Sequence, residues 1–145
     1  MSIFGWLFGT AQKSKTYRNL EPLHLAPGLA FDFEVIGEFQ RVLDDLCGGR
    51  RESGYDLQVT AQLCFLDKDC FDPNAVGVFI SQRIVGYIPQ HLAPKLRSEL
   101  LRLNPKERPV SCDAKVVGGW DQQDRGEGHY YAVKLSLAQP LRLRA

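Results

Sequence analysis

The sequence predicts a mainly β domain of the α+β class, a small, six-stranded, partly open β-barrel flanked by two short helices. Apolar and polar residues alternate in six short stretches, and two other stretches place apolar residues three and four positions apart. A chain of 145 residues, 44% of them hydrophobic, fits one compact domain that buries about 70% of its unfolded surface. Short antiparallel strands must hide their edges, and closing the sheet is a common solution.

The first two predicted strands have the clearest alternation. Residues 31–38 place Phe31, Phe33 and Val35 between acidic residues. Residues 55–65 form the second strand. Its predicted inward positions are Leu57, Val59, Ala61, Leu63 and Phe65.

Residues 75–80 and 83–89 predict two further strands around the Ser81–Gln82 turn. Gly77 and Gly86 interrupt them, and glycine inside a strand marks a bend or a close approach of another backbone. We expect such features in a small curved barrel.

Residues 110–120 and 129–137 predict the last two strands, joined by a polar loop over 121–128. Their predicted inward residues are Val110, Cys112, Ala114, Val116, Tyr131, Val133, Leu135 and Leu137.

Two helices are predicted by apolar residues at spacings of three and four. Residues 39–46 form the first helix, which Gly48 and Gly49 end. Residues 91–103 form the second, with Pro94 in its first turn. The apolar faces consist of Phe39, Val42, Leu43 and Leu46 in the first helix and Leu92, Leu96, Leu100 and Leu103 in the second.

The chain divides into an N-terminal extension over residues 1–28 and a barrel domain over 29–145. Residues 1–12 begin with an apolar stretch that is too short for a membrane span and lacks the features of a signal peptide. Two interpretations stay open: a docking segment that makes weak contact with a membrane surface or a partner, and a tail that frays or folds back on the domain.

Composition excludes a strongly basic nucleic-acid binder, since 18 basic residues face 17 acidic ones. The four cysteines form no CxxC pair and match no histidine spacing, so we expect reduced, mostly buried thiols and no zinc site. No long apolar run appears, and we expect a soluble, cytoplasmic protein.

Acidic residues before the third strand do not match a calcium loop. A loop of the EF-hand type that starts at Asp67 needs glycine where Asp72 stands and glutamate where Val78 stands. The histidines are His24, His91 and His129, and no nucleophile signature accompanies them. We therefore expect no metal, no cofactor and no enzymatic activity.

Local backbone preferences explain only some of the residues in the turn FDPNAV. Pro73 fixes its own φ and holds Asp72 extended, and Asn74 tolerates left-handed geometry. A tight corner follows from these three residues. It does not require an aromatic residue at Phe71.

Several motifs together resemble the HIRAN domain. They are VIGEFQRVLDDL, FDPNAVGVFI, RIVGYIPQHLA and VVGGW, and the resemblance covers about residues 31 to 140. HIRAN domains are OB-like barrels that stand alone in bacteria or are fused to DNA translocases acting at stalled replication forks. The best-understood members bind single-stranded DNA and recognise its free 3′-hydroxyl end, so the resemblance implies this activity, a role in DNA repair, and a translocase as a protein partner.

The resemblance also implies an end-binding pocket. Phe71 and Asp72 match the family's aromatic-aspartate pair, in which the ring stacks on the terminal base and the carboxylate accepts a hydrogen bond from the 3′-hydroxyl. Phe39, Gln40 and Arg41 match the family's first contact region, with Gln40 in place of a tyrosine.

Further candidate contacts lie later in the chain. Tyr87 belongs to VGYIP, and Gln90 stands where the family has a basic residue. Lys95 and Arg97 are nearby cations for a phosphate. Trp120 either lines the far wall of the groove or seals the end of the barrel.

The leading hypothesis is a module that binds single-stranded DNA ends. The alternative is a non-catalytic adaptor that binds a protein or a membrane surface through the barrel groove and the N-terminal segment.

Overall fold

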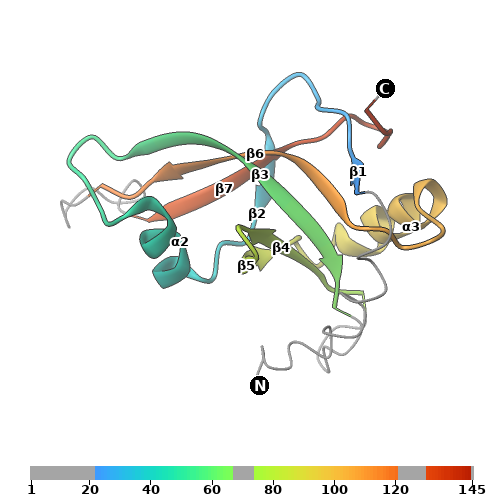
Figure 1. Cartoon of the computed structure of the whole chain (residues 1–145), viewed down its shortest axis with the longest axis horizontal. Helices are drawn as coiled ribbons and strands as arrows, with labels where there is room; N and C mark the ends of the chain where they lie inside the picture. The colour runs from blue at the N-terminus through green and yellow to red at the C-terminus, as the bar shows by residue number, and fades with distance from the viewer. Residues whose placement is uncertain (1–21, 67–73, 121–129, 145) are drawn as a thin grey trace.

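The computed structural model describes residues 22–66, 74–120 and 130–144 (Figure 1). Within these ranges the chain is mainly β. The elements are β1 (Leu23–His24), β2 (Phe33–Val35), α2 (Gln40–Cys47), β3 (Tyr55–Phe65), β4 (Val76–Ile80), β5 (Arg83–Tyr87), α3 (Ala93–Leu103), β6 (Val110–Gly118) and β7 (Tyr131–Ser136).

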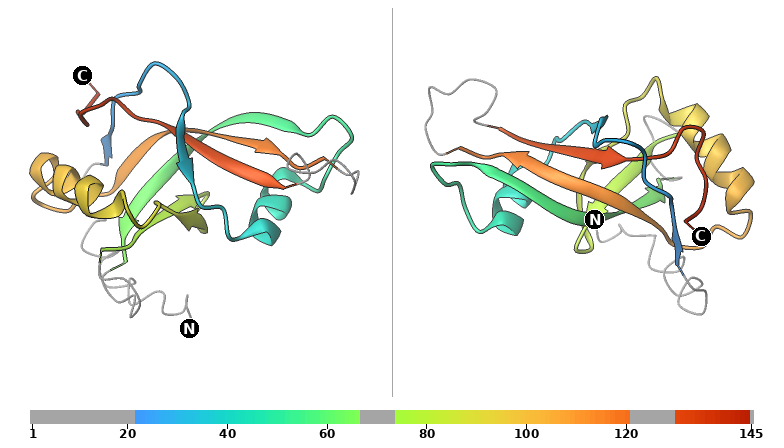
Figure 2. Two further views of the ribbon diagram at one scale, coloured as in Figure 1. Left: turned by 180° about the vertical axis from the view of Figure 1, so that it is seen from behind. Right: turned by 90° about the horizontal axis from the view of Figure 1, so that it is seen from above.

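Six strands form one curled, half-barrel antiparallel sheet in the order β2-β7-β6-β3-β4-β5. The short strand β1 pairs with β6 in parallel. Figures 1 and 2 show α2 and α3 at opposite ends of this sheet in all three views. For the described part of the chain, the prediction of a mainly β fold with two short helices and a partly open sheet is confirmed.

One backbone contact links the two ends of the strand order. Ile36, directly after β2, donates its N–H to the Tyr87 carbonyl at 2.9 Å, and the Tyr87 N–H donates to the Ile36 carbonyl at 3.1 Å. Gly86 permits this approach, because a Cβ there would lie 2.2 Å from the Ile36 carbonyl oxygen. We call Ile36, Gly86 and Tyr87 the seam.

The β4–β5 hairpin has the predicted turn. Ser81 and Gln82 both have positive φ, 50° and 68°, which is the geometry of a two-residue turn whose twist suits a hairpin. The register shifts between Val78 and Phe79. A Cβ at Gly77 would lie only 3.0 Å from the Phe79 ring, so the glycine makes room for that aromatic side chain. Gly86 thus marks the predicted close approach of another backbone, whereas the close neighbours of Gly77 are side chains.

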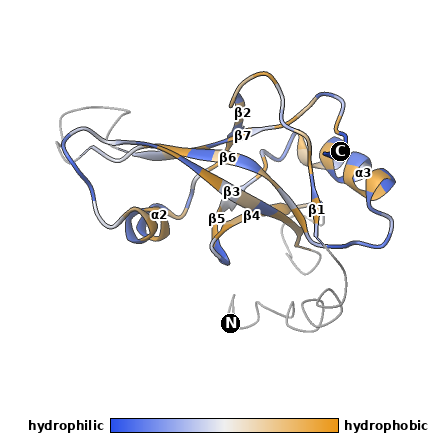
Figure 3. Ribbon diagram, turned by 45° about the horizontal axis from the view of Figure 1, so that its top comes forward, coloured by the Kyte–Doolittle hydropathy of each residue, from blue (hydrophilic) through white to orange (hydrophobic). Residues whose placement is uncertain are grey.

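The alternation of apolar and polar residues correctly predicts which side chains near β6 and β7 are buried in the core. All eight of their predicted inward residues are at most 5% exposed. Figure 3 shows both hydrophobic and hydrophilic residues on each helix, as amphipathic helices have. α2 buries Leu43, and α3 buries Leu96 and Leu100.

The helix boundaries follow the capping signals. Gly48 ends α2 in the left-handed conformation, with φ of 83°, and its N–H donates to the Asp45 carbonyl at 3.2 Å. Pro94 lies in the first turn of α3, where a missing N–H costs nothing.

Two sequence predictions differ from the structure. The strand predicted over 31–38 extends only from Phe33 to Val35, with Ile36 in an isolated bridge. Leu57, predicted to face the core, is 43% exposed. The physical reason is that β4 pairs with β3 only over residues 62–65, so no described strand lies beside Leu57 on that side.

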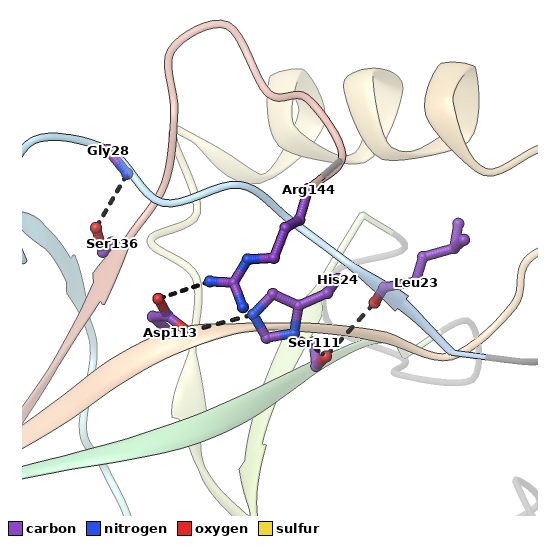
Figure 4. A network of polar contacts seen from close by, with 7 residues as sticks. All are labelled: Leu23, His24, Gly28, Ser111, Asp113, Ser136 and Arg144. Carbon is purple, nitrogen blue, oxygen red and sulfur yellow. Dashed lines mark hydrogen bonds and ion pairs between the residues drawn. The ribbon is translucent and has the colours of Figure 1, made fainter.

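The strand β1 was not predicted, and it lies within the stretch assigned to the N-terminal extension. Leu25, which follows it, is fully buried and pairs with Leu143. Figure 4 shows the polar contacts that fasten this region: His24 lies 2.9 Å from the Ser111 hydroxyl and 3.2 Å from Asp113, and Arg144 donates to Asp113 at 2.9 Å. Both ends of the described chain are therefore tied to β6.

The described cysteines differ in their exposure. Cys112 is fully buried, and burial raises its pKa to about 12, with the neighbouring Asp113 charge adding to the effect. Cys47 is partly buried, whereas Cys64 is exposed, contrary to the expectation of mostly buried thiols. Cys70 and the loop over 121–128 lie outside the described residues.

Substitution of Gly86 by alanine should destabilise the fold by about 2–3 kcal/mol, because the new methyl group forces the seam apart. Gly37→Ala is a matched control in the same region, since a Cβ there meets no atom closer than 3.7 Å. Urea unfolding of both variants measures the difference. Equal stability of the two would show that the seam contact contributes little to the fold.

Candidate nucleic-acid interface

An aromatic pair stands at the seam. Phe39 lies immediately before α2, and Tyr87 ends β5. Their ring centroids are 5.8 Å apart with planes tilted by 54°, an arrangement that is favourable between aromatic rings. Both side chains are partly exposed. The structure therefore brings together two candidate residues separated by 48 positions in the chain (87 minus 39).

Arg41 provides a cation close to this pair in the chain. It lies in the first turn of α2 and is exposed, and within the described residues it makes no hydrogen bond or ion pair. Ile36 adds apolar surface at the seam, where it is 48% exposed. Partly exposed rings with a cation nearby are the components that bind the bases and phosphates of single-stranded nucleic acid.

Gln40 has a different role from its neighbours. Its Nε2 donates to the carbonyl oxygens of Gly37, at 2.9 Å, and Tyr131, at 3.0 Å. Its Oε1 accepts the Tyr131 N–H at 2.9 Å. The carboxamide thus bonds to both backbone groups of Tyr131, as a neighbouring strand would, and fastens the start of α2 to β7. Both amide hydrogens of Gln40 are used within the protein.

Trp120 follows β6 at the end of the sheet where β3 begins. Its backbone forms a bridge with Arg51, and its carbonyl accepts a hydrogen bond from Arg50 at 3.2 Å. A Cβ at Gly54 would lie 2.8 Å from the indole nitrogen, so the ring packs directly on that glycine. Of the two roles considered for Trp120, these contacts favour sealing the end of the sheet.

The other candidates lie later in the chain. Gln90 is exposed three residues after Tyr87, and Lys95 is exposed in the first turn of α3. In Figure 1, α3, which carries Lys95, lies at the opposite end of the sheet from α2, which carries Arg41. Arg97 instead lies over the ring of Phe65, 4.0 Å from its centroid. Phe71 and Asp72 lie outside the described residues.

A cluster of tyrosines and arginines supports the loop after α2, and no sequence pattern indicates this cluster. The Tyr131 hydroxyl donates to Asp44 at 2.6 Å, and the Tyr55 hydroxyl donates to the Cys47 carbonyl at 2.9 Å. Arg51 lies 4.2 Å from the centroid of the Tyr55 ring. Burial, reinforced by the hydrogen bond to Asp44, raises the pKa of Tyr131.

The contacts of His24 include a serine and an aspartate, which the sequence spacing did not indicate. The order of hydrogen bonds from Ser111 through His24 to Asp113 is that of a nucleophile, a base and a carboxylate. The ring is reversed from the usual arrangement, since Nδ1 faces the serine and Nε2 the aspartate. Arg144 also binds the carboxylate. We interpret these contacts as the fastening of β1 and the C-terminal segment to β6.

The described ranges contain no candidate metal site and no candidate membrane span. No group of three or more histidine, cysteine, aspartate or glutamate residues there could hold a metal ion. Neither α2 nor α3 has the length and apolar content that a bilayer crossing needs.

Comparisons with known proteins leave the family of the chain open. No protein-family model, no curated protein and no solved structure matches it significantly. The resemblance to HIRAN domains therefore stays a sequence-based hypothesis.

Replacement of Gln40 by glutamate should lower stability by about 1–3 kcal/mol, because a carboxylate would face two carbonyl oxygens that it cannot satisfy. The adjacent Arg41→Ala provides the control and should leave stability within about 0.5 kcal/mol of wild type, since that side chain is exposed and unpaired within the described residues. Thermal unfolding of both variants tests this. A fully stable Gln40→Glu variant would contradict the assigned fastening role.

Proposed function

We propose that this protein binds single-stranded DNA at the surface formed by Phe39, Tyr87 and Arg41. The observation that carries the proposal is the ring contact between Phe39 and Tyr87, with an exposed arginine two residues after Phe39 in the chain. Aromatic rings stack on any base, and such stacking contributes ~1–3 kcal/mol per base without a sequence requirement. The curled antiparallel sheet supports this proposal, and we propose that it is an OB-like barrel.

Recognition of a free 3′-hydroxyl end is the finer part of the proposal. It rests on the resemblance to HIRAN domains, which assigns the terminal base to Phe71 and the hydroxyl to Asp72. A carboxylate accepts a hydrogen bond from a hydroxyl and repels a terminal phosphate. A repair or stalled-fork function, with a DNA translocase as partner, belongs to the same proposal.

The position of Gln40 sharpens the expected chemistry. In the family a tyrosine supports the hydroxyl contact at this position, whereas here the carboxamide is bonded to Gly37 and Tyr131. Discrimination between a 3′-hydroxyl and a 3′-phosphate therefore depends on Asp72. Phosphate attraction is modest, since Arg41 is the cation nearest in sequence to the aromatic pair, and the affinity should decrease only modestly as salt rises.

Fluorescence anisotropy with 5′-labelled single strands tests the proposal. Phe39→Leu, which keeps apolar volume but removes the ring, and Arg41→Ala should each weaken binding about tenfold. Arg102→Ala, an exposed arginine on α3, is the matched control and should bind as wild type does. Absence of wild-type binding, or equal loss in the control, would contradict binding at this surface.

A second set of oligonucleotides separates DNA binding from end recognition. Strands that end in a 3′-hydroxyl should bind more tightly than strands that end in a 3′-phosphate, and Asp72→Asn should reduce the difference. Equal affinity for both ends would overturn end recognition and leave DNA binding intact. If the chain instead sediments with liposomes, loses this on removal of residues 1–12 and binds no DNA, the adaptor function is favoured.

A further inference from the structure

The first half of β3 is an edge strand. β6 pairs with β3 from Tyr55 to Leu63, whereas β4 pairs with it only from Gln62 to Phe65. No described strand therefore lies beside residues 56–60 on the β4 side. Figures 1 and 2 show β6 between β7 and β3 at this end of the sheet, so that β3 is one of the two outer strands.

The hydrogen-bonding direction of this edge follows from the neighbouring pairs. Leu66 donates its N–H to the Ala75 carbonyl at 3.0 Å, so its backbone groups point to the β4 side. The backbone N–H and C=O groups of successive strand residues point to alternate sides of the strand. Because the register of β3 with β6 is continuous, the backbone groups of Asp56, Gln58 and Thr60 also point to the β4 side. Such a row of N–H and C=O groups is a template for another strand.

The side chains along this edge divide into two sets. Asp56, Gln58 and Thr60 are exposed and lie on one face of the sheet. Leu57 and Val59 lie on the other face, and Leu57 leaves 43% of its surface exposed. An edge with a long exposed apolar residue is poorly protected against pairing with another chain.

We propose that a second copy of this chain pairs with the β3 edge in antiparallel orientation, about a two-fold axis at Gln58. In this register Gln58 lies opposite Gln58 of the second copy, and the two residues exchange both backbone hydrogen bonds. Asp56 lies opposite Thr60, and Leu57 lies opposite Val59. Each copy contributes the N–H groups of Asp56, Gln58 and Thr60 and accepts the same three in return.

The stretch 56–60 is complementary to itself in this register, and this selects a second copy as the occupant. The threonine hydroxyl can donate to the aspartate carboxylate opposite it. Leu57 and Val59 form a non-hydrogen-bonded pair, in which side chains approach most closely, so the exposed leucine gains an apolar neighbour. A slip by one residue would place Leu57 on the polar face, so the register is well defined.

Charge does not oppose this pairing. Asp56 is the only charged residue of the stretch, and the two aspartates lie at opposite ends of the paired segment. Each aspartate also forms an ion pair with Lys115 of its own chain, with Nζ 2.9 Å from the carboxylate oxygen. The paired area is small, so the dimer is expected to be weak and to exchange with monomer.

Sedimentation velocity over a range of protein concentrations tests the proposal. Wild type should shift from monomer towards dimer as concentration rises. Gln58→Lys and Gln58→Glu each place like charges opposite one another at the axis and should weaken association about tenfold or more. Because the Gln58 side chain is exposed and its backbone groups point away from β6, both variants should fold normally.

An equimolar mixture of Gln58→Lys and Gln58→Glu gives the decisive result, since a lysine then faces a glutamate across the axis and association should return. Gln62→Lys is the matched control, an exposed residue on the same strand and face but within the segment that β4 already pairs, and it should associate as wild type does. Wild type that stays monomeric at all concentrations, or a mixture that associates no better than its components, would overturn the proposal.

Discussion

The fold depends on one close approach of backbones, the pair of hydrogen bonds between Ile36 and Tyr87 at the seam. This pair joins the first and last strands of the β2-β7-β6-β3-β4-β5 order and so holds the sheet in its curled form. It exists because Gly86 carries no side chain, since a Cβ there would contact the Ile36 carbonyl at 2.2 Å. The glycine of the VGYIP motif is therefore required for packing.

The candidate site follows from the same contact. Once Tyr87 is paired with Ile36, the three-residue connection from Ile36 to α2 places Phe39 against the Tyr87 ring. Gln40 then secures the beginning of α2 by its bonds to Tyr131, and Arg41 is left exposed on the first turn. Gln40 thus holds the helix, whereas the adjacent Arg41 remains available to a ligand.

The sheet is held differently at its two ends. Near α3, the β1 strand and the C-terminal segment are fastened to β6 through His24, Asp113 and Arg144. Near α2, the first half of β3 is paired with β6 on one side and with no described strand on the other. Leu57 is exposed, and the backbone groups of this half have no partner among the described strands, because β4 pairs with β3 only from Gln62 onwards. We place the proposed self-association at this end for that reason.

Sequence periodicity predicted the strands β3 to β7 and both helices, because apolar alternation and glycine stops act locally. It did not predict β1, whose two residues are too few for a periodic signal. The sequence shows only a short alternation there, with Leu23 and Leu25 separated by a polar residue between two prolines. It also misplaced Leu57, because burial of an inward residue depends on a neighbouring strand that only the tertiary structure specifies.

For the candidate site, Phe39, Arg41 and Tyr87 are three of the contact residues predicted from the sequence, and the fold brings Phe39 and Tyr87 into ring contact. It could not show that the Gln40 carboxamide is used within the protein, or that α3 carries Lys95 to the opposite end of the sheet. Both facts depend on contacts between residues far apart in the chain.

Amide hydrogen exchange, followed by NMR, measures directly how firmly the seam is closed. The amides of Ile36 and Tyr87 should exchange as slowly as those of the central strand β6, because opening the seam requires the sheet to uncurl. Exchange of these two amides as fast as that of unpaired loop amides, while β6 stays protected, would contradict the claim that the seam holds the fold together.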